Sequence, residues 1–65
     1  MKSFGENIRR NRESKGISQK KLGELLGFSA RTISDWECGN TEPNVATIKK
    51  ISIILDVSLE ELFDF

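Results

Sequence analysis

The chain has 65 residues, a formal net charge of +0, one cysteine and no histidine. A chain of this length forms one domain with a thin core, and a lone cysteine without histidine provides neither an internal disulfide nor a zinc site. No apolar run approaches the roughly 20 residues of a membrane-spanning helix, and polar sequence follows the first residues. We therefore expect a single helical domain over residues 1–65, in the cytoplasm and without cofactor or metal.

The charges are unevenly distributed along the chain. Eight of the ten basic residues lie at or before Thr32, alongside three acidic residues, whereas two lysines and seven acidic residues follow. This asymmetry leaves two interpretations open. Either a basic face is directed toward a polyanion, or the surface is a solvated mixture of charges.

The first predicted helix covers residues 3–15. Ser3 and Glu6 have the spacing of a capping box, and Phe4 and Ile8 lie one turn apart on one face. This helix should contribute that apolar face to the core.

The second predicted helix covers residues 18–26, with Ser18 as its N-cap. Three leucines have the i, i+3, i+4 spacing of a core-facing stripe: Leu22, Leu25 and Leu26. Gly23 weakens the helix by about 1 kcal/mol relative to alanine. We expect another helix to cross closely at this glycine.

The third predicted helix covers residues 29–38 and begins after the turn at Gly27, where Phe28 is apolar enough to point inward. The gap between the two helices has about the length of the turn in a helix-turn-helix. Its apolar stripe is narrow and includes Trp36, which we assign to the core rather than to base stacking. The helix therefore presents a wide polar face, and the unpartnered Cys38 is interpreted as a turn residue rather than a reactive thiol.

Two more helices are predicted in the second half. Asn44 follows a proline and caps a helix over residues 44–55, for which a strand at 51–55 is the weaker alternative. Its apolar stripe consists of Val45, Ile48, Ile51 and Leu55. Ser58 and Glu61 repeat the capping-box spacing at the start of a last helix over residues 58–63.

Four motifs occur in order: S-Q-x-x-L at 18–22, G-x-S at 27–29, I-S-x-W-E at 33–37 and V-S-L-E-E-L at 57–62. Together with Pro43, they resemble the phage-repressor-like helix-turn-helix family (Xre/Cro type) over nearly the whole chain. The resemblance implies an all-α, lambda-repressor-like bundle of five helices, with the motif at about residues 19–38. It also implies a dimer that binds a two-fold, palindromic operator in double-stranded DNA.

The resemblance assigns DNA contacts to two helix starts. Gln19 lies where backbone N–H groups and the helix dipole hold a phosphate, although a surface glutamine is the alternative. Arg31 is the best candidate for a forked contact to guanine, with a phosphate clamp or a solvated arginine as alternatives. The candidate DNA-contacting residues are Gln19, Ser29, Ala30, Arg31, Thr32, Ser34, Asp35, Asn40 and Thr41.

Asp35 has two possible roles on that face. It can accept a hydrogen bond from cytosine, or it can pair with Arg31 four residues earlier and orient it, which we favour slightly. Ser29 and Thr32 are within reach of phosphate or thymine in this interpretation, and Ala30 offers only a methyl group.

The remaining charged residues are assigned either to stabilising the fold or to contacts outside the chain. The resemblance implies that Arg12 and Glu37 form a structural ion pair between the first and third helices. Arg9 and Arg10 are left for phosphate or solvent, and the sequence does not choose between them. Glu42 stands in a loop where the family usually carries a basic residue, so we expect a shallow salt dependence of DNA binding.

Apolar residues near the C-terminus exceed what a small core needs, which predicts a dimer contact. The residues assigned to it are Ile54, Leu59, Phe63 and Phe65. The chain has no histidine, phosphate-binding loop or nucleophile–base pair, so we do not expect an enzyme. We expect a sequence-specific DNA-binding transcriptional regulator, a repressor. The alternative is a protein-binding module of the same fold, an antirepressor or antitoxin-like subunit that grips another regulator.

Overall fold

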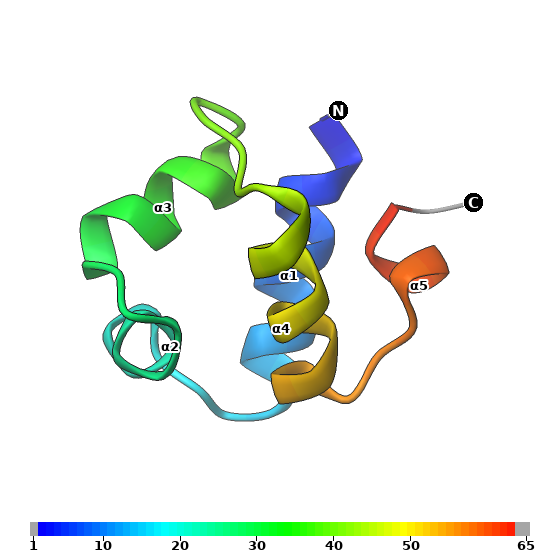
Figure 1. Ribbon diagram of the computed structural model, residues 1–65, viewed down its shortest axis with the longest axis horizontal. Coiled ribbons are helices and arrows are strands. Elements are labelled where there is room, and N and C mark those ends of the chain that lie inside the picture. Colours follow the sequence, from blue (N-terminus) through cyan, green and yellow to red (C-terminus); the bar gives the residue numbers. More distant parts are fainter. Residues whose placement is uncertain (1, 64–65) are drawn as a thin grey trace.

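A computed structural model describes residues 2–63, which form five α-helices and no strand. The helices are α1 (Lys2–Ser14), α2 (Gln19–Leu26), α3 (Ala30–Cys38), α4 (Val45–Leu55) and α5 (Leu59–Phe63) (Figure 1). This confirms the all-α, five-helix architecture, and the helix rather than the strand at residues 51–55.

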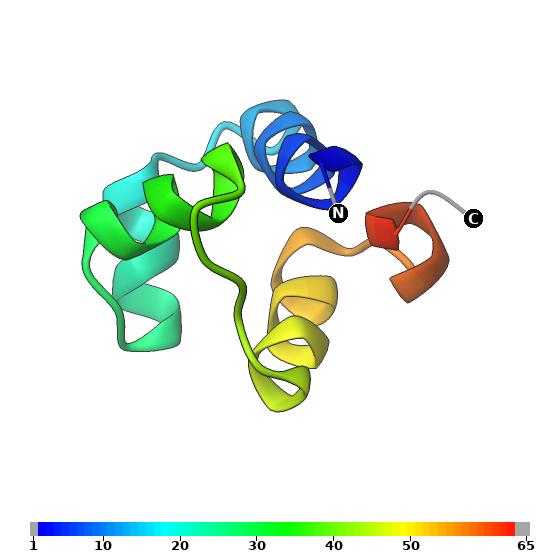
Figure 2. The same ribbon diagram turned by 90° about the horizontal axis from the view of Figure 1, so that it is seen from above.

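The helices are arranged around α1. It packs against α3, α4 and α5, while α2 packs mainly against α3. Figure 2 shows α2 and α3 side by side at one end of the molecule and α5 at the other, with α1 and α4 between them. The pair formed by α2 and α3 is therefore supported from behind by α1 and is open on its other side.

The N-terminal caps follow the predicted pattern. Ser18 Oγ, Ser29 Oγ and Asn44 Oδ1 each accept a hydrogen bond from the backbone N–H three residues later, at 2.9, 3.1 and 2.8 Å. At α5, Glu61 N–H donates to Ser58 Oγ at 3.1 Å, and Ser58 N–H donates to the Glu61 carboxylate at 3.4 Å. These contacts satisfy backbone donors that a helix start leaves free, so they fix where four of the five helices begin.

The remaining helix start was predicted wrongly. Helix α1 begins at Lys2, so Ser3 lies inside the helix and is not its N-cap. Nothing in the two preceding residue types breaks a helix, and the helix extends past the serine. At the C-terminal ends, Gly27 and Gly39 have φ of 84° and 83°, values that favour glycine because a Cβ atom opposes them.

The core is built from apolar side chains of all five helices. Its buried members are Phe4, Ile8, Leu22, Ile33, Trp36, Ile51, Leu55 and Leu62. Trp36 is only 4% exposed, which confirms the core assignment over base stacking. Ile17, in the α1–α2 connection, packs against this cluster as predicted.

Three apolar residues expected to face the core are exposed: Leu25, Phe28 and Val45. Leu25, in the last turn of α2, is 50% exposed. Phe28 does not enter the core but packs its ring edge-on against Trp36, with 5.0 Å between the ring centroids. Val45, the first residue of α4, is 68% exposed. A bundle this small leaves the ends of its helices uncovered.

Two glycines allow main chains to approach closely. A Cβ atom at Gly23 would lie 2.4 Å from the carbonyl oxygen of Phe28, so the turn's own backbone requires the glycine, not a crossing helix as predicted. A Cβ atom at Gly5 would lie 2.4 Å from the carbonyl oxygen of Trp36 and 2.6 Å from that of Glu37. Helix α1 therefore crosses the end of α3 in direct main-chain contact. Within the described chain, no helix is long and apolar enough to cross a bilayer.

Candidate nucleic-acid interface

Helix α3 has one buried and one outward face. Ile33, Trp36 and Glu37 are buried against the bundle, while Arg31 is exposed and Ser34 is half-buried. Within residues 2–63, Arg31 makes no hydrogen bond or ion pair, so its guanidinium is free to bind a ligand outside the chain. The first turns of α3 thus offer a cation on a helix whose other side is fixed in the core.

Asp35 does not orient Arg31 as predicted. In the part of the chain that the structure describes, no ion pair joins the two side chains. Instead, Asp35 Oδ1 lies 3.5 Å from Asn40 Nδ2, at the limit of a hydrogen bond, and its carbonyl oxygen accepts from the backbone N–H groups of Asn40 (2.9 Å) and Thr41 (3.4 Å). The left-handed turn at Gly39 brings the loop back over Asp35, which therefore closes the α3–α4 loop.

The side chains at the start of α3 have local partners. Ser29 Oγ caps the helix and also lies 3.0 Å from Thr32 Oγ1. Ala30 is half-buried, whereas Asn40 and Thr41 are exposed in the following loop. Ser29 and Thr32 thus stabilise the end of α3 that carries Arg31.

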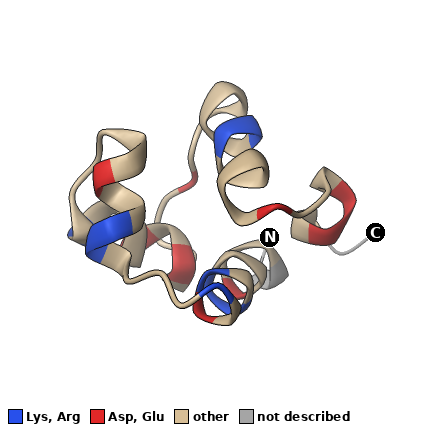
Figure 3. Cartoon of the chain, turned by 90° about the horizontal axis from the view of Figure 1, so that it is seen from below, with Lys and Arg blue, Asp and Glu red and all other residues tan. Residues whose placement is uncertain are grey.

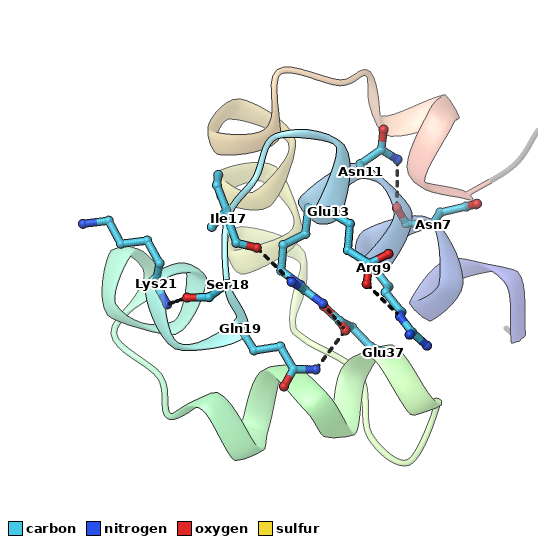
Figure 4. A network of polar contacts seen from close by, with 10 residues as sticks. Asn7, Arg9, Asn11, Glu13, Ile17, Ser18, Gln19, Lys21 and Glu37 are labelled. Carbon is cyan, nitrogen blue, oxygen red and sulfur yellow. Dashed lines mark hydrogen bonds and ion pairs between the residues drawn. The ribbon is translucent and has the colours of Figure 1, made fainter.

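A buried network joins the helix-turn-helix to α1 (Figure 4). Arg12 donates from Nε to Glu37 Oε2 at 2.6 Å and from Nη2 to Glu37 Oε1 at 3.1 Å, and their side chains are 9% and 3% exposed. Arg12 Nη1 also donates to the carbonyl oxygen of Ile17 at 2.8 Å. The hydrogen bond to Glu37 raises the pKa of Arg12, against the opposing effect of burial. The structure thus brings together the two residues paired in the sequence analysis.

Gln19 also joins this network, a contact that the sequence alone does not predict. Its Nε2 donates to Glu37 Oε1 at 3.0 Å, so Glu37 holds side chains from both α1 and α2. No local pattern signals this contact, because 18 residues separate the two positions. An amide has two N–H groups, and the second one of Gln19 remains for an outside acceptor. The network fixes the N-terminus of α2 against α3.

The charge asymmetry of the sequence is only partly kept in space. Figure 3 shows acidic residues on α5, at the end of the molecule opposite α2, but also on other helices, and it shows basic residues on α4 as well as on α2. Lys20 and Lys21 are exposed in the first turn of α2, next to Gln19. Basic groups therefore flank the N-terminus of α2 although the formal net charge is +0.

The residues assigned to a dimer contact differ in how far they are buried in their own chain. Leu59 is 40% exposed. Ile54 is half-buried and packs against the core, and the Phe63 ring stacks on that of Phe4 with 4.8 Å between centroids. Phe65 lies outside the described residues. Because Ile54 and Phe63 contribute to their own chain's core, the exposed part of the predicted contact is smaller than expected.

Comparison with known proteins identifies the class of fold. The sequence pattern of the helix-turn-helix family matches residues 8–62, and the chain belongs to this family. The chain is similar to the SPbeta prophage-derived HTH-type transcriptional regulator YonR of Bacillus subtilis, with 39% identity over 59 residues that cover 91% of this chain and 55% of YonR. The chain spans about half the length of YonR and of a second Bacillus subtilis regulator, YqaE.

Two solved structures agree with this assignment. The P22 c2 repressor in complex with a synthetic operator superposes with a TM-score of 0.84 at 39% identity, covering 91% of this chain and 89% of that chain. The biofilm regulator SinR in complex with DNA superposes with a TM-score of 0.82 at 34% identity, covering 94% and 98%. The fold of this chain is therefore that of helix-turn-helix repressors.

Proposed function

We propose that this protein binds double-stranded DNA and regulates transcription by placing α3 in the major groove of an operator. The observation that carries the proposal is Arg31, a cation without an internal partner in the described chain, on the outward face of a helix fixed from behind. A guanidinium in that position matches the two acceptors of guanine in the major groove. The solved complexes of the P22 c2 repressor and of SinR with DNA support it.

The other polar groups on this side mainly position the protein on the DNA backbone. The N-terminus of α2, with its free N–H groups and the second amide hydrogen of Gln19, is suited to a backbone phosphate. Asn40 and Thr41 offer polar groups to the backbone from the loop after α3. Ser34, beside Arg31, faces the same DNA. The protein acts by binding rather than by catalysis, and occupation of the operator represses transcription.

The proposed active form is a homodimer on DNA. Ile53, at 78% exposed, and Leu59 are uncovered apolar side chains on the neighbouring helices α4 and α5. Burial of such groups between two copies is favourable by about 25 cal/mol per Å². A two-fold dimer places its half-sites about 34 Å apart, one turn of DNA.

A selection from a random DNA pool tests this function. We expect enrichment of one sequence in two inverted halves, and the Arg31→Ala variant should bind it about 1–3 kcal/mol more weakly with relaxed preference at one base pair. The exposed Lys49, on α4, provides the control, because Lys49→Ala should bind like the wild type.

Absence of any enriched sequence would contradict the proposal, as would equal binding by the two variants. If the protein instead abolished the gel shift of another regulator, the protein-binding alternative would replace it.

A further inference from the structure

Arg9 and Arg10 are adjacent and chemically identical, yet they lie on different faces of α1. Arg10 Nη2 donates to Asn7 Oδ1, and Asn7 Nδ2 in turn donates to the carbonyl oxygen of Leu62 in α5 at 3.0 Å. Arg10 is therefore directed toward the α5 side of the molecule. Arg9 lies about 100° away around the helix, on the side that faces α3.

Arg9 borders a groove between α1 and α3. The groove has a volume of 280 Å³ and is lined by Arg9, Arg12, Glu13, Gln19, Ser34, Glu37 and Cys38. Figure 4 shows Arg9 and Gln19 on either side of Glu37, which pairs with Arg12. Because those two charges neutralise each other, the remaining donors at the groove are the guanidinium of Arg9, the amide of Gln19 and the hydroxyl of Ser34. This set is suited to a phosphate.

Arg9 already has a partner, but the contact is weak. Its Nε lies 3.3 Å from Glu13 Oε2, and the two side chains are 65% and 55% exposed. Exposed ion pairs of this kind contribute little, because water screens both charges. A phosphate of DNA can replace the carboxylate of Glu13, since binding to the polyanion also releases condensed counter-ions.

We propose that the groove between α1 and α3 holds a backbone phosphate of the bound DNA, with Arg9 as its cation. Glu13 is the internal counter-ion from which Arg9 is released on binding. This inference rests on the proposed function, and it adds α1 to the two helices of the motif as a third point of attachment. It also assigns the phosphate contact to Arg9 rather than to Arg10, two residues that the sequence leaves equivalent.

Salt-dependent DNA binding of matched variants tests the assignment. Arg9→Ala should weaken binding about tenfold at roughly 0.1 M salt and reduce the slope of log K against log salt by about 0.9, the value for one phosphate contact. Arg10→Ala, the matched control, should change neither quantity. Glu13→Gln should strengthen binding about threefold, because it removes the competitor of the phosphate. Equal effects of Arg9→Ala and Arg10→Ala would overturn the assignment.

Cys38 supplies an independent measurement, because it is the chain's one cysteine, is exposed and lines the same groove. Saturating DNA should slow the reaction of its thiol with a disulfide reagent at least fivefold. An unchanged rate on fully bound protein would mean that the DNA backbone does not cover the groove, and the assignment would fall.

The two proposals fail in different ways. If the selected DNA binds and Arg31→Ala weakens it, while the two arginine variants of α1 behave alike, only the groove assignment is wrong. If no DNA is bound at all, both proposals are wrong.

Discussion

Glu37 accepts hydrogen bonds from Arg12 in α1 and Gln19 in α2 while belonging to α3. Its burial makes this ion pair different from the exposed pair of Arg9 and Glu13, because an uncompensated charge inside the protein is costly. The raised pKa of Arg12 means that its charge, and the stability that depends on it, is present throughout the neutral range and is lost only at extreme alkaline pH.

Glu37→Gln should lower the free energy of unfolding by about 3 kcal/mol, because Arg12 remains buried without a counter-charge. Urea unfolding followed by the fluorescence of Trp36 measures the change. Glu13→Gln is the control and should alter stability by less than about 0.5 kcal/mol, since its partner is exposed. Equal losses in the two variants would show that Glu37 does not hold a buried charge.

At the scale of elements, the turn between α2 and α3 is defined by backbone contacts. Gly23 lies against the carbonyl oxygen of Phe28, and its own carbonyl accepts from the N–H groups of Gly27 and Phe28, both at 2.8 Å. The left-handed Gly27 reverses the chain between the helices. The angle between α2 and α3 thus depends on having glycine at position 23, because a side chain there would collide with the backbone of the turn.

Gly23→Ala should lower the melting temperature, although alanine favours a helix by about 1 kcal/mol over glycine. The steric cost prevails, because the added Cβ would meet a backbone atom that cannot rotate away, and we expect a net loss of about 1–3 kcal/mol. Thermal unfolding followed by circular dichroism measures it. Glu24→Ala, at the exposed neighbouring position, should be neutral or slightly stabilising. A melting temperature at or above the wild-type value for Gly23→Ala would contradict the close approach.

The positions of the elements were predictable because local chemistry sets them. Serine or asparagine caps and left-handed glycines act within one turn of the chain, so Ser18, Ser29 and Asn44 mark helix starts correctly. The exposure of Leu25 and Val45 was not predictable, since spacing gives the face of a helix but not how far a neighbour extends over it.

The candidate site likewise has features that the sequence predicts and features that depend on how the helices pack. Family resemblance supplied the pairing of Arg12 with Glu37, but the contact of Gln19 and the different directions of Arg9 and Arg10 depend on how α1 meets α3 and α5. No pattern within a single helix contains that information.

At the scale of the whole molecule, apolar surface remains on α4 and α5. Ile53 and Leu59 are uncovered there, and the exposed Glu60 and Glu61 lie on α5 at the same end of the molecule. In the proposed homodimer, a second copy would cover these side chains, because a two-fold contact at this end leaves both copies of α3 free.

Ile53→Ser should weaken dimerisation without destabilising the monomer, because its side chain makes few internal contacts. Sedimentation equilibrium, with and without operator DNA, measures the association, and urea unfolding should change by less than about 0.5 kcal/mol. Val45→Ser, an exposed change two turns earlier on α4, is the control and should leave association unchanged. A wild type that stays monomeric both in solution and on DNA would exclude the contact.

Gly5 leaves no gap between α1 and α3, since their main chains already touch at the end of α3. A tilt of α3 would therefore have to move α1 with it, because no side chain lies between their main chains at this point. The connection before α4 is itself tied to α3, since the backbone N–H groups of Asn40 and Thr41 donate to the carbonyl oxygen of Asp35. The main-chain contact at Gly5 therefore supports both the end of α3 and the start of the loop that follows it.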